Sequence, residues 1–257
     1  MSRDPDGSAS QTLPGAPPPW GLLGTIGWGV LGAFAWFAVQ FVVLVTFIEW
    51  RRAQAPDALD MSQLARDGFL LAFATIMAGP AWIAVSALAA RLRGWRPRDY
   101  LALVTPRRGE LLFGIACLGT LLIAFDLLSL ALGRDVVPQF MRDAYLSARN
   151  SDALVPFFIA VAVVAPVTEE IVFRGFLFRG LSASFLGVSG TLIVTAVVWA
   201  GMHVQYDWFI LGQIVVIGLV LGWLRWASGS TLLTIILHML TNLAACIQAA
   251  IKVEWMT

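Results

Sequence analysis

Seven long apolar blocks constrain this chain more than any other feature of its sequence. They are separated by charged or Gly/Pro-rich stretches and lie at 20–48, 68–90, 111–132, 153–180, 190–206, 208–226 and 230–251. A helix needs about 20 residues to cross the hydrocarbon core of a bilayer, and most of these blocks approach or exceed that length. Charged residues make up only 13% of the chain, against roughly 25% in soluble domains. The sequence therefore predicts a polytopic integral membrane protein, multi-pass in the cell membrane.

The blocks are expected to be helices. A segment in lipid must satisfy its backbone polar groups internally, so it is either a helix or part of a closed barrel. The blocks lack the apolar/polar alternation of a barrel strand. The predicted fold class is all-α, a transmembrane helical bundle. We divide the chain into a disordered tail at 1–19, rich in Pro, Gly and Ser, N-terminal transmembrane helices at 20–152, and a C-terminal transmembrane region at 153–251.

Arginine placement suggests an orientation. The loop 91–110 holds six arginines and is expected to be cytoplasmic, because short cytoplasmic loops are enriched in basic residues. That orientation places the N-terminus inside. The loops predicted on the other face also carry arginines, with acidic residues balancing them. The formal net charge of the whole chain is +1, so a nucleic-acid partner is not indicated.

Several polar side chains occur inside the apolar blocks. Ionisable groups at membrane depth are costly and usually mark a functional site. Both histidines of the chain are among them. The residues concerned are Asp126, Glu169, Glu170, Arg174, His203, His238 and Asn242.

Helical spacing separates the roles of these residues. Glu170 and Arg174 are four apart with the acid first, which favours an ion pair. Glu169 is turned by about 100° from Glu170, so Arg174 is poorly placed to neutralise it. One glutamate is thus expected to be a structural partner and the other a free carboxylate. His238 and Asn242 are also four apart and share a face.

Depth brings these residues together. Counted from the predicted helix ends, Glu169, His203 and His238 lie roughly 12–20 Å deep, at 1.5 Å per residue. Three helices would therefore present Glu, His, His and Asn in one layer. Pro166 removes a helical hydrogen bond close to Glu169 and so opens the backbone to water. Asp126 is expected to bond to a neighbouring helix, and Trp199 to serve in packing.

The order EExxxR, aromatic-xxxH and HxxxN resembles the CPBP family. That family includes CAAX prenyl-protein endopeptidases and bacterial proteins of bacteriocin processing and immunity, also called Abi. The resemblance covers residues 153–250, which makes 153–251 the CPBP-like catalytic core. The second motif is usually FxxxH, whereas this chain has Trp199. The family core is described with eight helices, so seven or eight spans are expected.

The resemblance implies a metal-independent, glutamate-type intramembrane endopeptidase without a cofactor. Glu169, with His203, would activate a water, while His238 and Asn242 would hold the oxyanion. Glu170 and Arg174 would support the site. Amide hydrolysis needs a base for the water and donors for the oxyanion, and these residue types supply both. The expected partners are the lipid bilayer and a peptide or protein substrate that is membrane-bound or lipid-modified.

Two alternatives remain open at this point. In the first, a divalent metal binds His203, His238 and a glutamate, although the chain has no HExxH motif. In the second, the protein is a non-catalytic immunity, scaffold or transport protein whose polar cluster only fixes the packing of helices. The intact set of Glu169, both histidines and Asn242 argues against the second alternative.

Overall fold

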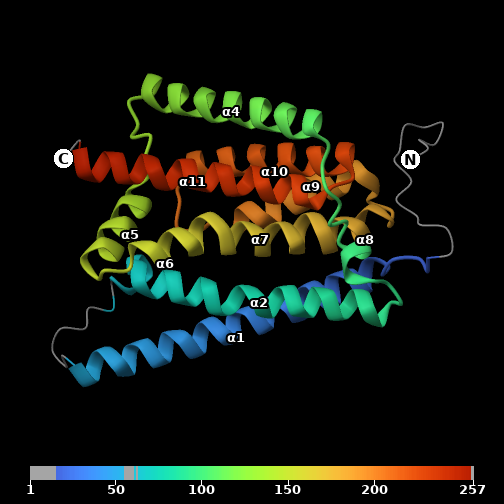
Figure 1. The fold of residues 1–257 in the computed structure, drawn as a ribbon, viewed down its shortest axis with the longest axis horizontal. Helices are drawn as coiled ribbons and strands as arrows, with labels where there is room; N and C mark the ends of the chain where they lie inside the picture. The colour runs from blue at the N-terminus through green and yellow to red at the C-terminus, as the bar shows by residue number, and fades with distance from the viewer. Residues whose placement is uncertain (1–15, 55–60, 62, 256–257) are drawn as a thin grey trace.

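The computed structural model describes residues 16–54, 61 and 63–255, and within them every regular element is a helix. Long helices run side by side along one direction (Figure 1). The elements are α1 (Leu22–Gln54), η2 (Leu64–Arg66), α2 (Gly68–Leu92), α3 (Pro97–Tyr100), α4 (Arg108–Ala131), α5 (Gln139–Asn150), α6 (Leu154–Ile159), η3 (Ala160–Val164), α7 (Ala165–Glu170), η4 (Ile171–Leu177), α8 (Phe178–Ser182), α9 (Gly187–Gly201), α10 (Trp208–Ser228) and α11 (Thr231–Trp255).

Six apolar helices in the described part of the chain are long enough to cross a membrane. They are α1, α2, α4, the continuous helix Leu154–Ser182, α10 and α11. Their side chains carry little charge and many face outward, as expected where lipid is the solvent. The prediction of an all-α transmembrane bundle is confirmed. The predicted seventh block, 190–206, forms the shorter apolar helix α9.

α9 differs from the prediction in length as well as in bounds. It contains 15 residues and ends at Gly201, so it spans roughly 22 Å, less than the roughly 30 Å of a hydrocarbon core. His203 therefore follows the helix in the turn 202–207, instead of lying within a span. The turn ends at Asp207, whose side chain caps α10 by accepting a hydrogen bond from the Ile210 N–H at 3.0 Å.

The predicted loop between the third and fourth blocks contains the amphipathic helix α5. Its buried residues, Met141, Ala144, Tyr145 and Ala148, recur every three or four positions and pack against α2 and α11. Its length of 12 residues and its many charges set it apart from the apolar blocks. Burial and a hydrogen bond to Glu254 raise the pKa of Tyr145, so its phenol remains a donor at neutral pH.

The helix Leu154–Ser182 contains two segments of wider winding. The segments η3 and η4 are π-helical and flank α7, the one-and-a-half turns that end at Glu170. In η3 the Ala165 N–H donates to the Ala160 carbonyl, five residues back. Pro166 follows directly and has no N–H to continue the ladder. π-helical turns within α-helices are frequent at functional sites.

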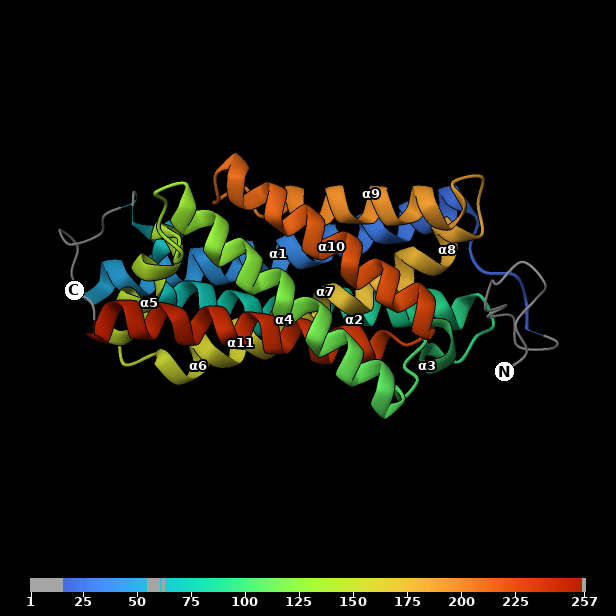
Figure 2. The same cartoon turned by 90° about the horizontal axis from the view of Figure 1, so that it is seen from above.

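The two ends of the bundle carry different elements. Figure 2 shows α3 at the end where the N-terminal part of α1 lies, and α5 at the opposite end. The loop with six arginines contains α3. Pro17 and Pro18, at the end of the predicted tail, accept hydrogen bonds there from Trp95 and Arg93. Residues 1–15 of that tail lie outside the described residues, and the division into domains stays a prediction.

The predicted orientation in the membrane can be tested at two exposed positions, one at each end of the helical bundle. In a background with Cys117 and Cys246 replaced by Ala, we expect Thr105→Cys to resist a membrane-impermeant maleimide in intact cells and to react after permeabilisation. Ser151→Cys should react in intact cells. The physical reason is that the arginine-rich loop is retained in the cytoplasm. The reverse labelling pattern would place the α5 end inside.

Candidate active site

A fully buried ion pair lies at the centre of the bundle. Arg174 Nη1 donates to Glu170 Oε1 at 2.9 Å, and neither side chain is exposed. His238 Nδ1 lies 2.9 Å from the same carboxylate oxygen. An ionised carboxylate only accepts, so this nitrogen carries the proton. The ion pair predicted from the four-residue spacing is confirmed, and it extends across to α11.

Arg174 also connects to α9 and α10. Its Nη2 donates to the Gly218 carbonyl at 3.1 Å, and its guanidinium lies 4.7 Å from the centre of the Trp199 ring. A Cβ on Gly218 would lie 3.0 Å from Trp199 Cε3, so the absence of a side chain allows α10 to approach α9 this closely. Three helices, counting the one that carries both Arg174 and Glu170, thus contribute to accommodating one buried cation.

Glu169 has different surroundings from its neighbour. Its side chain is half-buried, and its Oε2 accepts a hydrogen bond from Trp199 Nε1 at 2.5 Å. The predicted division between the two glutamates therefore agrees with their contacts. Glu170 is held by two cationic or protonated partners, whereas Glu169 is held by a neutral donor.

His203 is fixed by the end of α9. Its Nδ1 lies 3.0 Å from the Trp199 carbonyl, and a carbonyl only accepts. Nδ1 therefore carries the proton, and Nε2 of the neutral ring is an acceptor. The rings of His203 and Trp199 are 5.2 Å apart. His203 thus keeps a lone pair available at the site although it lies beyond the helix.

Asn242 compensates for the backbone defect at Pro166. Its Nδ2 donates to the Val161 carbonyl at 2.9 Å. In the π-helical segment the donor five residues after Val161 would be Pro166, which has no N–H, and the Ala165 N–H is already directed to Ala160. The carboxamide supplies the missing donor. Its second N–H remains for another acceptor.

One cavity of about 550 Å³ collects the predicted residues. Glu169, His203, His238 and Asn242 all line it, from α7, the 202–207 turn and α11. Asp126 lines it as well and accepts a hydrogen bond from Gln248 at 2.8 Å, as expected of a bond between neighbouring helices. Glu170 and Arg174 lie behind this layer and do not line the cavity.

A second, more polar cavity of about 620 Å³ adjoins the first near α5. The two share the lining residues Pro138, Phe140, Gln205, Tyr206 and Ile210. We call the second cavity the vestibule. Burial raises the pKa of Tyr206, so the phenol at this junction stays neutral.

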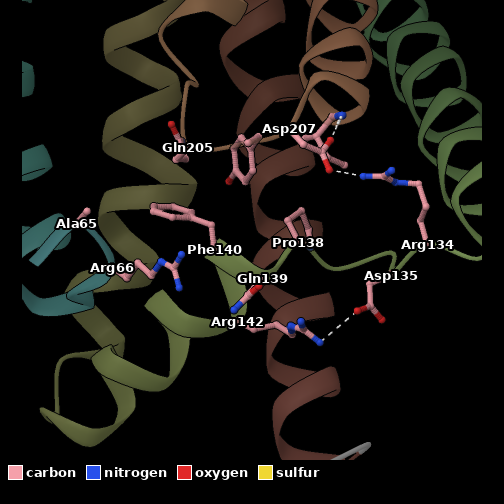
Figure 3. A pocket seen from close by; sticks show the side chains of 12 residues that line it. Ala65, Arg66, Arg134, Asp135, Pro138, Gln139, Phe140, Arg142, Gln205 and Asp207 are labelled. Carbon is pink, nitrogen blue, oxygen red and sulfur yellow. Dashed lines mark hydrogen bonds and ion pairs between the residues drawn. The ribbon is translucent and has the colours of Figure 1, made fainter. Parts of the chain in front are cut away.

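Charged side chains surround the vestibule (Figure 3). Arg134 pairs with Asp207, and Arg142 lies 3.4 Å from Asp135. The first pair joins the α4–α5 connection to the turn that carries His203. Arg66 also lines the cavity. The vestibule therefore gives the deeper cavity a polar entrance at the α5 end of the bundle.

Sequence reasoning missed two features of this site. Trp199 was assigned to packing, although its indole N–H contacts Glu169 and its ring contacts Arg174. The vestibule was missed because its residues come from connections read as loops. The one signal in the sequence was that Trp199 stands four residues before His203, a spacing that places two residues close together when both lie on a helix.

The described residues contain no group of three His, Cys, Asp or Glu side chains arranged to hold a metal ion. His238 directs Nδ1 to Glu170 and His203 directs Nδ1 to a carbonyl. Each histidine therefore has only Nε2 left for a ligand.

Comparison with known families covers some of the helices that line the cavity, whereas the lining residues from α2, α4 and α5 lie outside the match. Residues 151–244 match the family described as Type II CAAX prenyl endopeptidase Rce1-like. This part of the chain is therefore similar to the Rce1-like family. The Rce1-like segment contains Glu169, His203, His238 and Asn242, together with the buried ion pair. No curated protein and no solved structure gives a significant match. The apolar helices indicate a multi-pass membrane protein, and the family match indicates that its C-terminal part resembles a membrane endopeptidase.

Arg174→Ala is predicted to destabilise the Rce1-like segment. It leaves the Glu170 carboxylate buried without its cation, which costs roughly 3–5 kcal/mol in the free energy of unfolding. Thermal unfolding in detergent should show a much lower midpoint and a lower folded yield. Arg52→Ala is the matched control, because Arg52 pairs with Glu49 within one helix at 56% and 65% exposure. That pair should contribute no more than about 1 kcal/mol. Equal stability of both variants would contradict a supporting role for the pair.

Proposed function

We propose that this protein is an intramembrane endopeptidase that hydrolyses peptide bonds with a water activated by Glu169. The observation that carries the proposal is the shared cavity, in which the Glu169 carboxylate, bonded to Trp199 and not to an arginine, lies with His203, His238 and Asn242. The substrate would be a peptide or protein that is membrane-associated or lipid-modified. The family match supports endopeptidase chemistry in general.

The base is assigned to Glu169 from its contacts. Its Oε2 accepts from Trp199, which leaves Oε1 to take a proton from water. His203 Nε2 can accept a hydrogen bond from the other water hydrogen and so orient the oxygen lone pair toward the carbonyl carbon. The hydroxide adds to that carbon, and Glu169 then returns the proton to the departing amine. Glu170 does not take this role because Arg174 and His238 hold its charge.

The oxyanion donors are assigned to His238 and Asn242. Asn242 has one N–H left after bonding the Val161 carbonyl. His238 already donates Nδ1–H to Glu170, so it can donate from Nε2 only when the ring carries both protons. The Glu170 carboxylate stabilises that imidazolium. Donors placed before the reaction stabilise developing charge strongly in a dry site.

The vestibule supports an aqueous route to this chemistry. Polar and charged residues line it, and five residues connect its lining to that of the catalytic cavity. Water and a polar peptide segment can enter from the α5 end, while an attached apolar portion of the substrate stays in lipid. A soluble peptide without a membrane anchor would lack the apolar portion that stays in lipid.

Glu169→Gln is predicted to abolish turnover without unfolding the protein. The amide keeps size and an acceptor for Trp199 but cannot take a proton, so activity should fall by roughly 10²–10⁴-fold. The assay is cleavage of a fluorogenic farnesylated CAAX peptide in proteoliposomes. In addition, the proteomes of membranes with the parent protein and with the variant are compared for a precursor that accumulates in the variant. Asn242→Ala, which removes an oxyanion donor, should cost roughly 10²–10³-fold in turnover.

Glu170→Gln is the matched comparison for the neighbouring carboxylate. It should resemble Arg174→Ala, with a lower unfolding midpoint as part of its phenotype, because the buried cation loses its partner. A purely structural cluster makes no such distinction between the two glutamates. Well-folded Glu169→Gln protein with full cleavage and no accumulating precursor would defeat the protease proposal in favour of a scaffold.

Hydrolysis is predicted to proceed without a metal. Elemental analysis of the purified protein should find no stoichiometric zinc, and chelators should leave peptide cleavage unchanged. The reason is that the proposed water is activated by a carboxylate and a histidine. Stoichiometric metal that disappears in His203→Ala or His238→Ala would favour the metal-dependent alternative instead.

A further inference from the structure

We infer that Trp199 is a positioning residue that holds both members of the water-activating pair. This inference rests on the proposed function. Trp199 contacts Glu169 through its side chain and His203 through its main chain. Each contact determines which atom of the partner remains for water. The atoms that remain for water are Oε1 of Glu169 and Nε2 of His203.

The indole ring is itself fixed on several sides. Arg174 lies over it at 4.7 Å, and the His238 ring meets it at 5.3 Å and 90°. Its surface is only 3% exposed, and the close approach of Gly218 leaves no space behind it. The direction of the Nε1–H bond is therefore set by packing. A donor fixed in this way holds the Glu169 carboxylate in one rotamer.

A neutral donor suits a base better than a cation does. An arginine on Glu169 would form an ion pair like that of Glu170 and would hold its charge against protonation. The indole N–H orients the carboxylate while adding no formal charge. Phenylalanine, the usual residue at this place in the FxxxH motif that the chain resembles, would keep the ring but have no donor. The tryptophan of this chain therefore adds a contact that the motif does not require.

Trp199→Phe tests the donor while keeping an aromatic ring. We expect turnover of the farnesylated CAAX peptide to fall by about 10- to 100-fold, the effect of losing one hydrogen bond to a charged group. The KM should change little, because the loss affects the base and not the binding of peptide. A simple packing role would instead lower stability without this split between kcat and KM.

Trp82→Phe is the matched control. Trp82 belongs to the same buried cluster as Trp199 and is 6% exposed. Its Nε1 has no hydrogen-bond partner among the residues that the structure describes. The same substitution therefore removes a similar volume from the same core but no hydrogen bond. Its kcat should equal that of the parent protein. An equal fall of kcat in both variants would assign the effect to packing and overturn the inference.

The contact itself can be observed without substrate. In ¹⁵N-tryptophan-labelled protein in micelles, the indole resonance lost in Trp199→Phe identifies Trp199. That proton should move upfield in Glu169→Gln, because a neutral acceptor bonds less strongly, and further in Glu169→Ala. The Trp82 resonance should stay in place. The shifts are measured in variants that keep Trp199, and Trp199→Tyr provides the assignment of the resonance if Trp199→Phe folds poorly.

The outcomes separate this inference from the proposed function. If the chemical shift of the Trp199 indole proton is the same in both Glu169 variants as in the parent protein, the hydrogen bond to Glu169 is absent. That result overturns this inference and leaves the proposed function intact. A confirmed bond with unchanged kcat in Trp199→Phe overturns the positioning role while leaving the protease proposal intact. Full activity of Glu169→Gln defeats the proposed function, and the positioning role with it, whatever the resonance shows.

Discussion

The charge on Arg174 is the constraint around which the core of this protein is arranged. A guanidinium with no exposure inside an apolar bundle is costly unless its charge is balanced and at least part of its donors are satisfied. Glu170 balances the charge, the Gly218 carbonyl takes a second N–H, and the Trp199 ring covers its face. Because Gly218 and Trp199 lie on other helices than Arg174, accommodating this one ion fixes how the helix Leu154–Ser182 packs against α9 and α10. His238 joins them to α11 through the same carboxylate. The site is thus assembled by a requirement of stability, before any requirement of chemistry.

Asn242 shows how a local defect in one helix can determine a residue on another. Pro166 leaves the Val161 carbonyl without its backbone donor, and an unsatisfied carbonyl at membrane depth is costly. The carboxamide of α11 removes that cost and ties α11 to η3. The same bond fixes the orientation of the amide, so its remaining N–H has a defined direction. At this position the structural reason for an asparagine coincides with the role proposed for it as an oxyanion donor, whereas an alanine would serve neither.

The sequence predicted this fold and site unevenly, for physical reasons. Long spans were predictable because hydropathy over 20 residues measures the property that the bilayer selects. The Glu170–Arg174 pair was predictable because both residues lie on one helix at a spacing that makes them neighbours. The His238 contact to Glu170 joins residues 68 positions apart and depends on how α7 and α11 pack. α5 was missed because 12 amphipathic residues give no apolar block. The role of Trp199 was missed because an aromatic residue in an apolar helix is usually packed, and only its neighbours show where the N–H points.

The shortness of α9 has a consequence for the surrounding lipid. Roughly 22 Å of helix cannot match a hydrocarbon layer of roughly 30 Å, and such hydrophobic mismatch is relieved by local thinning of the bilayer. Thinning beside α9 would bring the headgroup layer, with its water, down to the turn that carries His203. Acyl chains of different length would change that depth by a few ångströms on one side of the bundle alone. The hydration of the candidate cavity is then a property shared between the protein and its membrane, and bilayer thickness becomes a variable of the proposed reaction.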